Sequence, residues 1–369
     1  MEKEPRRSLV VVLGAGASHD CYVKEYSPPP EKHFQPPLTS GLFQRASSFQ
    51  NILTRYRYAV PAAAEFNRRV AQEGRASVEE YLKELNAEDD PICRRQFLHI
   101  GLYLQDLFST ISRTYLGGTN VPSAFISLVD QIYKANIRTQ VLKQVALVTL
   151  NYDLFLEQAI ATVFGKPLAN IEEYAPFRAG WSLIKFHGSV NWGKRVRVPN
   201  EAFPRISGPA FQKTMRVIDQ APDGKLEFLD GCVVLDVKEN KIYAPEFPCH
   251  YPALAVPVQE KYGPVCPPFH VDALRKALEA EEIALLIIGF SAQDQDLLDE
   301  LKGAWPRIKW VNIVNGKREN GLETYERLKV AGLCPELYEP RGPFIENRGF
   351  ADYVLQKDGL QHVLREMLG

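Results

Sequence analysis

The stretch that decides the fold is residues 8–18, SLVVVLGAGAS. Its first part, Ser8 to Leu13, is rich in valine, which is typical of a parallel strand buried on both faces. It ends in Gly14-Ala-Gly16, which predicts a tight turn into a helix. The two glycines would let the backbone approach a diphosphate, and Ser18 would add a hydroxyl donor. The turn therefore predicts a nucleotide site, with a purely structural turn as the alternative.

The glycine pattern of this turn is incomplete by itself. A dinucleotide-binding fingerprint has a third glycine, which would fall at position 19, and this chain has His19 there. A nucleotide site must therefore be argued from several turns together.

Other predicted strands also end in polar or glycine-containing turns. Helices alternate with these strands, which predicts an α/β fold with a Rossmann-type parallel sheet. Because open α/β sheets bind ligands at the carboxyl ends of their strands, the turns are expected to lie together at one edge. The strands and the turns that follow them are 145–150 with Thr149-Leu-Asn151-Tyr-Asp153, 182–186 with His187-Gly188, 283–288 with Gly289-Phe-Ser291, and 310–314 with Asn315.

The rest of the chain is expected to surround this Rossmann-type domain. Apolar residues at helical spacing predict a helical insertion, and prolines with alternating apolar runs predict a small irregular subdomain with hairpins. Two helices are expected to close the chain. The predicted units are the Rossmann-type domain over 1–42, 140–195 and 269–320, the helical insertion over 43–139, the irregular β-containing insertion over 196–268, and a C-terminal helical extension over 321–369.

Composition limits the classes of binding partner and the cellular location that we expect for this protein. Lys plus Arg total 44 against 45 Asp plus Glu, so the net charge of -1 offers no general attraction to nucleic acid or to an anionic membrane. The apolar run near the N-terminus is too short for a signal peptide or a membrane span. The six cysteines contain no CxxC pair, so no zinc site is expected and the thiols are expected to be reduced in a cytoplasm.

Read in order, the turns resemble the sirtuin family. The resemblance rests on GAGxS from Gly14, TxNxD from Thr149, HG at His187, GxS from Gly289, and a later strand that ends in Asn315. It covers the Rossmann parts up to about that asparagine, and it does not cover the helical insertion or the tail. The order is specific, although no single motif is.

The resemblance implies a role for each matching residue. Catalysis would fall to Asn151, which orders the ribose or a water, and to His187 as the base. NAD+ would be bound by Gly14, Ala15, Gly16, Ser18, Thr149, Asp153, Gly289, Ser291 and Asn315. As alternatives, Asn151 and Asp153 could cap the helix that begins near Leu154, and Asp294 is expected to be a cap rather than a ligand.

Departures from the lysine-deacylating sirtuins point to a different activity. The segment after the first turn, from Tyr22 to Ser27, lacks their usual motif, and their four-cysteine zinc module is represented only by Cys232, Cys249 and Cys266. The chain is more similar to the zinc-free sirtuin-like NAD+ hydrolases of bacterial antiphage defence. That resemblance implies NAD+ as the substrate, a homo-oligomer, and a HerA-like ATPase or another defence partner. The alternatives are a zinc-free deacylase or ADP-ribosyltransferase, and a non-catalytic module that senses NAD or ADP-ribose.

Overall fold

The structure is a computed structural model that describes most of the chain. No helix in the part it describes is long and apolar enough to cross a membrane. The segment from Tyr22 to Ser27 lies outside the described residues. Cys334, one of the six cysteines, also lies outside them. The described residues are 6–21, 35–73, 78–116, 123–197, 210–221, 225–238, 241–243, 249–255, 265–333, 344–356 and 359–368.

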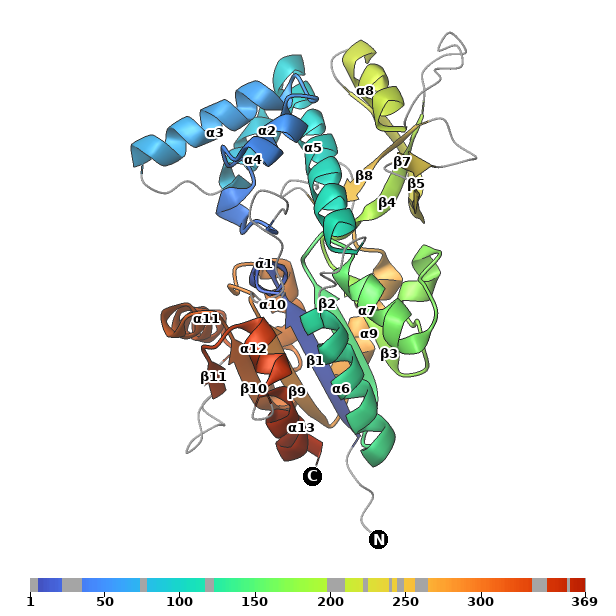
Figure 1. The fold of residues 1–369 in the computed structure, drawn as a ribbon, viewed down its shortest axis with the longest axis vertical. Coiled ribbons are helices and arrows are strands. Elements are labelled where there is room, and N and C mark those ends of the chain that lie inside the picture. Colours follow the sequence, from blue (N-terminus) through green and yellow to red (C-terminus); the bar gives the residue numbers. More distant parts are fainter. Residues whose placement is uncertain are drawn as a thin grey trace.

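The centre of the molecule is a six-stranded parallel sheet (Figure 1). Its order is β11-β10-β9-β1-β2-β3. Numbered by their place in the chain, these strands run 3-2-1-4-5-6 across the sheet, which is the Rossmann arrangement. The predicted fold class is thus confirmed. The strands are β1 (Arg7–Leu13), β2 (Leu142–Thr149), β3 (Trp181–Lys185), β9 (Glu282–Ile288), β10 (Ile308–Val314) and β11 (Phe344–Glu346).

Helices cover both faces of this sheet, as the doubly apolar strands require. In β1, Val10 and Val12 pack into one core, whereas Leu9, Val11 and Leu13 pack into the other. The core that holds Val10 and Val12 also takes in α9 (Pro268–Leu278), α10 (Gln295–Lys302) and α11 (Arg318–Val330). The other core takes in α6 (Ser123–Thr139), α7 (Phe155–Phe164), α12 (Phe350–Leu355) and α13 (Leu360–Leu368).

Helix α6 lies within the range expected for the helical insertion, but it packs on the main sheet. It contacts α7, α12 and α13, and its buried residues include Phe125 and Leu128. It therefore serves as the crossover between β1 and β2. The other helices of that range stand beyond the carboxyl ends of the strands (Figure 1). They are α2 (Ser47–Leu53), α3 (Ala59–Glu73), α4 (Val78–Ala87) and α5 (Pro91–Leu116), preceded by a 3-10 helix, η3 (Thr39–Gly41).

A second, antiparallel sheet of three strands, β5-β4-β8, packs against α5. Gln105 of α5 donates to the Val190 carbonyl at 3.0 Å, and Tyr251 donates to the Leu98 carbonyl at 3.2 Å. These bonds fix the insertion to the small sheet. The elements here are β4 (Gly188–Arg197), α8 (Ala210–Gln220), β5 (Glu227–Val234), β8 (His250–Leu254) and the hairpin of β6 (Asp236–Lys238) with β7 (Lys241–Tyr243).

The end of the chain is tied to the first turn. Asp20 follows α1 (Ala15–His19), and its Oδ2 accepts from the Phe350 N–H at the start of α12 at 2.8 Å. The sequence predicted only helices after Asn315, but the structure adds β11 to the edge of the sheet. Three residues are too few to show a strand period.

Burial of His270 on α9 predicts acid sensitivity. Its Nε2 lies 3.1 Å from the Ile171 carbonyl of η4 (Ile171–Tyr174), and burial lowers the pKa of the imidazole from 6.5 to about 4. Because the unfolded chain binds the proton first, the stabilisation is complete above about pH 6.5 and is lost as the pH falls towards 4. We expect the free energy of unfolding to fall by about 2 kcal/mol from this residue between pH 7 and pH 5. Urea titrations should show a smaller pH dependence for His270→Gln, and an unchanged dependence for exposed His362→Gln.

Candidate active site at the carboxyl edge of the sheet

The central strands end at the same level. Leu13 is paired with Thr149 on one side and with Ile288 on the other. Thr149 is paired in turn with Lys185, and Ile288 with Val314. The turns that carry the predicted site residues therefore all start from one edge. The strand order reverses between β1 and β9, and open α/β sheets bind ligands at such a switch point.

The two glycine turns at the switch point pack backbone against backbone. The Gly16 N–H donates to the Gly289 carbonyl at 3.0 Å. A Cβ on Gly16 would lie 2.8 Å from Gly289 Cα, and one on Gly14 would lie 2.6 Å from the Gly289 oxygen. Glycine is thus required at these positions by the protein's own packing. A bulky residue at Gly16 would therefore collide with the neighbouring turn.

A buried hydrogen-bonded chain lies under the first turn. The Ser18 hydroxyl donates to Asp153 Oδ2 at 2.5 Å, and Asn151 Nδ2 donates to Ser18 Oγ at 2.7 Å and to the Gly14 carbonyl at 2.9 Å. Because a carbonyl can only accept, the amide of Asn151 has one possible orientation. Both of its N–H donors are used, which leaves its oxygen to offer to a ligand.

The hydrogen-bonded chain gives Ser18 and Asp153 partners within the protein. The Ser18 hydroxyl proton is directed at Asp153. Asp153 Oδ1 accepts from the Phe155 N–H at 3.2 Å, so the carboxylate also supports the start of α7. Burial raises the pKa of Asp153, although the charge of Lys185 and the bond from Ser18 oppose the rise. Both residues therefore support the first turn from the interior of the protein.

His187 lies between β3 and β4 with its side chain 26% exposed. Its Nε2 lies 2.7 Å from Asp294 Oδ2, and its carbonyl accepts from the Ala255 N–H at 2.8 Å. Asp294 is the N-cap of α10, where it accepts from the Leu297 N–H at 2.8 Å, as the cap prediction required. The contact with His187 is an addition that the sequence did not predict.

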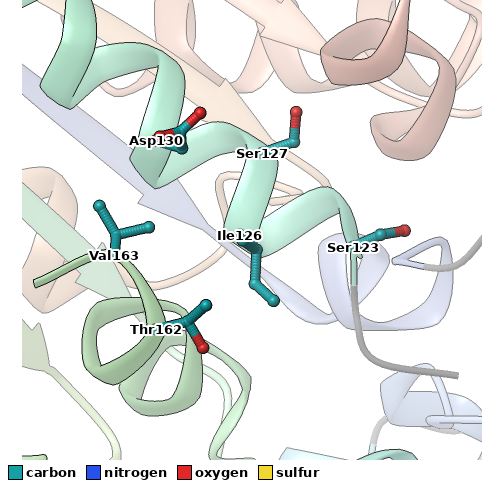
Figure 2. A pocket seen from close by; sticks show the side chains of 6 residues that line it. All are labelled: Ser123, Ile126, Ser127, Asp130, Thr162 and Val163. Atoms are coloured by element: carbon teal, nitrogen blue, oxygen red, sulfur yellow. The ribbon is translucent and has the colours of Figure 1, made fainter. Parts of the chain in front are cut away.

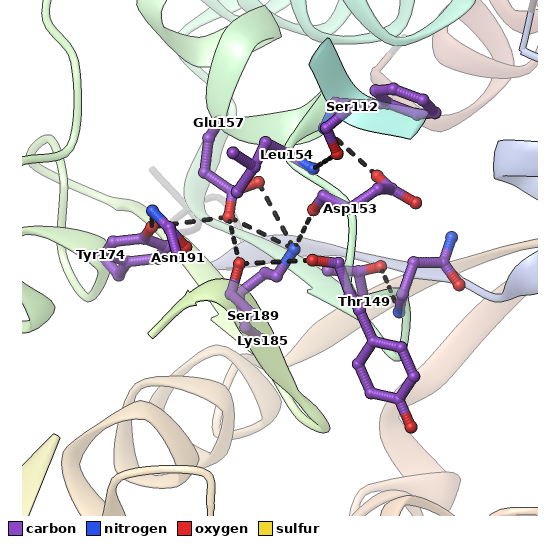
Figure 3. Close-up of polar contacts among 12 residues, drawn as sticks. Ser112, Thr149, Asp153, Leu154, Glu157, Tyr174, Lys185, Ser189 and Asn191 are labelled. Carbon is purple, nitrogen blue, oxygen red and sulfur yellow. Dashed lines mark hydrogen bonds and ion pairs between the residues drawn. The ribbon is translucent and has the colours of Figure 1, made fainter. Parts of the chain in front are cut away.

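A buried lysine anchors the turn after β2, and it too was missed. Lys185, with its side chain 1% exposed, donates to the Asp153 carbonyl at 2.5 Å and pairs with Glu157 at 3.2 Å (Figure 3). Glu157 also accepts from Ser189 at 3.1 Å. Burial raises the pKa of Glu157, and the Lys185 charge opposes this. The signal in the sequence was a lysine at the end of an apolar strand, since a buried lysine needs a partner.

The remaining predicted residues lie along the same edge. Thr149 Oγ1 accepts from the Asn151 N–H at 3.1 Å and so shapes its own turn. Ser291 is exposed and donates to Gln293 at 3.1 Å. Asn315 donates to Thr324 at 3.4 Å on the other side of the switch point. Ala15 is half-buried at the start of α1.

A shallow depression of about 400 Å³ lies elsewhere, over the outer surfaces of α6 and α7 (Figure 2). It includes none of the predicted site residues. In the ranges that the structure describes, no group of three or more His, Cys, Asp or Glu is arranged to hold a metal ion. The lining residues are Ser123, Ile126, Ser127, Asp130, Thr162 and Val163.

Comparisons with known proteins return structures but no sequence relatives. No protein-family model and no curated protein matches this chain. A Sir2 structure with an inhibitor, 2'-O-acetyl-ADP-ribose and a deacetylated p53 peptide is 11% identical over 98% of this chain and 94% of that one, with a TM-score of 0.36. A Sir2 structure bound to an acetylated peptide is 13% identical over 98% and 93% of the two chains, with a TM-score of 0.34. These values describe a weak likeness, and the fold class follows from the strand order and register.

Proposed function

We propose that this protein binds NAD+ at the carboxyl edge of the main sheet and hydrolyses the bond between nicotinamide and ribose. The observation that carries the proposal is the placement of Asn151 and His187. They follow two neighbouring strands at the same register position, two residues beyond the paired Thr149 and Lys185. Asn151 offers an amide oxygen, and His187 offers an imidazole ring held by a carboxylate. A module that only binds NAD or ADP-ribose needs neither group at this position.

The reaction suits this pair of groups. Nicotinamide leaves NAD+ as a neutral molecule, so no general acid is needed, and the protein must stabilise a ribose cation and place a water. In the proposed step the C–N bond breaks, the water oxygen bonds to the ribose carbon, and His187 accepts the water proton and returns it to solvent. Asn151 Oδ1 would accept a hydrogen bond from that water or from a ribose hydroxyl. The products are nicotinamide and ADP-ribose, or a cyclised form if a group of the substrate replaces water.

The proposed binding surface follows from which groups remain accessible. Ala15, Gly16 and Ser291 are partly or fully exposed at the edge, and they would contact NAD+. Gly14, Ser18, Thr149, Asp153, Gly289 and Asn315 would hold the turns that shape the site, because their groups are engaged within the protein.

Incubation of the purified protein with NAD+ tests the proposal. We expect nicotinamide and ADP-ribose to form in equal amounts, as followed by chromatography, and a chelator to leave the rate unchanged. Stoichiometric zinc in the protein, with activity lost on its removal, would contradict the metal-free mechanism. Binding of NAD+ without consumption would instead support the sensing module.

The biological setting is proposed by resemblance alone. In this setting the protein would act in antiphage defence in a cytoplasm. Assembly into a homo-oligomer with a HerA-like ATPase partner would restrain the activity until it is triggered. The insertion helices and the C-terminal helix are the proposed contact surfaces. Light scattering that shows a monomer, alone and with a genetically linked partner, would argue against this setting.

A further inference from the structure

We infer that Asp294 is a positioning residue that fixes the tautomer of His187, so that Nδ1 is the ring atom that accepts a proton; this rests on the proposed function. Asp294 Oδ2 lies 2.7 Å from His187 Nε2. A carboxylate can only accept, so Nε2 carries the hydrogen and Nδ1 of the neutral ring keeps its lone pair. In the part of the chain that the structure describes, Nδ1 makes no hydrogen bond, and the side chain is 26% exposed.

The carboxylate of Asp294 is itself held in place. Its Oδ1 accepts from the Leu297 N–H at 2.8 Å, at the positive end of α10. Burial by itself raises the pKa of Asp294, but the bond and charge of His187 and the Leu297 N–H outweigh it, so this pKa lies below its ordinary value. Asp294 therefore stays ionised at neutral pH and meets His187 from a fixed direction.

A helix cap alone does not require this arrangement. Ser or Asn would cap α10 as well as Asp does, and neither would place a second acceptor on the imidazole. The other buried acids of the edge are already engaged, since Asp153 accepts from Ser18 and Glu157 pairs with Lys185. Among the described residues, Asp294 is thus the charged group in contact with the His187 ring.

The variant Asp294→Asn tests the inference with little change in shape. The Leu297 N–H needs an acceptor, so the new amide must keep its oxygen at the helix and point its N–H₂ at His187. Nε2 must then accept, and the hydrogen moves to Nδ1. Spectra of protein with ¹⁵N-labelled histidine, recorded where the ring is neutral, should show the protonated nitrogen change from Nε2 to Nδ1. His187→Gln assigns the signal.

The same variant should lower kcat for NAD+ at least about tenfold with little change in KM, because the proton acceptor is lost while the binding surface is intact. Asp299→Asn, which removes an exposed charge from the same helix, should change neither readout. If Asp294→Asn does not fold, Asp294→Ser keeps the cap and removes the contact, and it should also lower kcat.

Two results would overturn the inference. One is an unchanged His187 tautomer in Asp294→Asn, and the other is a changed tautomer with wild-type kcat. Failure of the proposed function looks different, because the wild-type protein would then not consume NAD+. The tautomer spectra would still decide whether Asp294 sets the ring.

Discussion

Replacing His187 by alanine is expected to slow NAD+ cleavage by about two to four orders of magnitude, which is the usual contribution of a positioned base. The melting temperature should change little, because the side chain is partly exposed and contributes little packed volume. Release of nicotinamide, measured beside a thermal melt of the same preparation, tests both statements. Near-wild-type turnover with a normal melt would remove His187 from the mechanism.

Asn151→Ala should lower the rate as strongly, but at a cost in stability that the sequence did not predict. The sequence placed this residue on a turn at the edge of the sheet, and the structure buries its side chain there and gives its amide two acceptors. Losing these bonds is expected to lower the free energy of unfolding by about 1–3 kcal/mol.

Asn67→Ala is the matched control for Asn151→Ala. Asn67 lies in the helical insertion, and its amide donates to the Phe43 carbonyl at 2.9 Å. We expect this variant to lose stability and to retain cleavage. If both variants lost activity in proportion to unfolding, Asn151 would be a structural residue only.

The largest effect on folding is expected for Gly289→Ala. Gly289 has a φ of +58°, and an added Cβ would lie 2.2 Å from the Ala17 backbone nitrogen and 2.4 Å from the Gly16 carbonyl carbon. Neither neighbour is the end of a flexible side chain, so the two turns must separate. The loss should exceed the roughly 1–3 kcal/mol typical of overpacking, and it should leave little soluble protein.

A control for Gly289→Ala is available in the loop after α10. Gly303 has a φ of -63° and has no atom within 4 Å of an added Cβ, so Gly303→Ala should fold normally. Expression yield and urea titration distinguish the two variants. A stable Gly289→Ala protein would mean that the contact between the turns is not needed to form the edge.

The carboxyl edge of the sheet was predictable because the strands that lead to it have mostly apolar sequences. The Ile283–Ile288 run is apolar throughout, and the Val145–Leu150 run is apolar except for Thr149, which is typical of strands buried on both faces in an α/β protein. The turns that carry the site residues come immediately after these strands in the sequence, so they could be predicted together with the strands. β4 was not predicted, because its sequence from Gly188 mixes glycine, asparagine and lysine, and only its pairing with β5 and β8 makes it a strand.

The contacts within the site were less predictable than its residues. His187 and Asp294 are separated by 107 positions, and their meeting depends on the path of the turn after β9. Lys185 pairs with Glu157 only because α7 places Glu157 beside the end of β3. Ser18 was expected to donate to a phosphate because a hydroxyl after a glycine turn has that use in general, whereas its bond to Asp153, 135 positions away, depends on the fold.

The position of β1 also constrains how the protein is made. Within this sheet β1 is synthesised before the other strands, yet it lies at the centre of the sheet, and its partner Glu282 is 275 residues from Arg7. Until β9 has been synthesised, a valine-rich strand has one unpaired edge, which is a template for aggregation. The switch point also lacks one of its two turns until Gly289 emerges. A nascent chain would therefore be inactive towards NAD+ and in need of protection, and both conditions would end together when residues 282–289 dock.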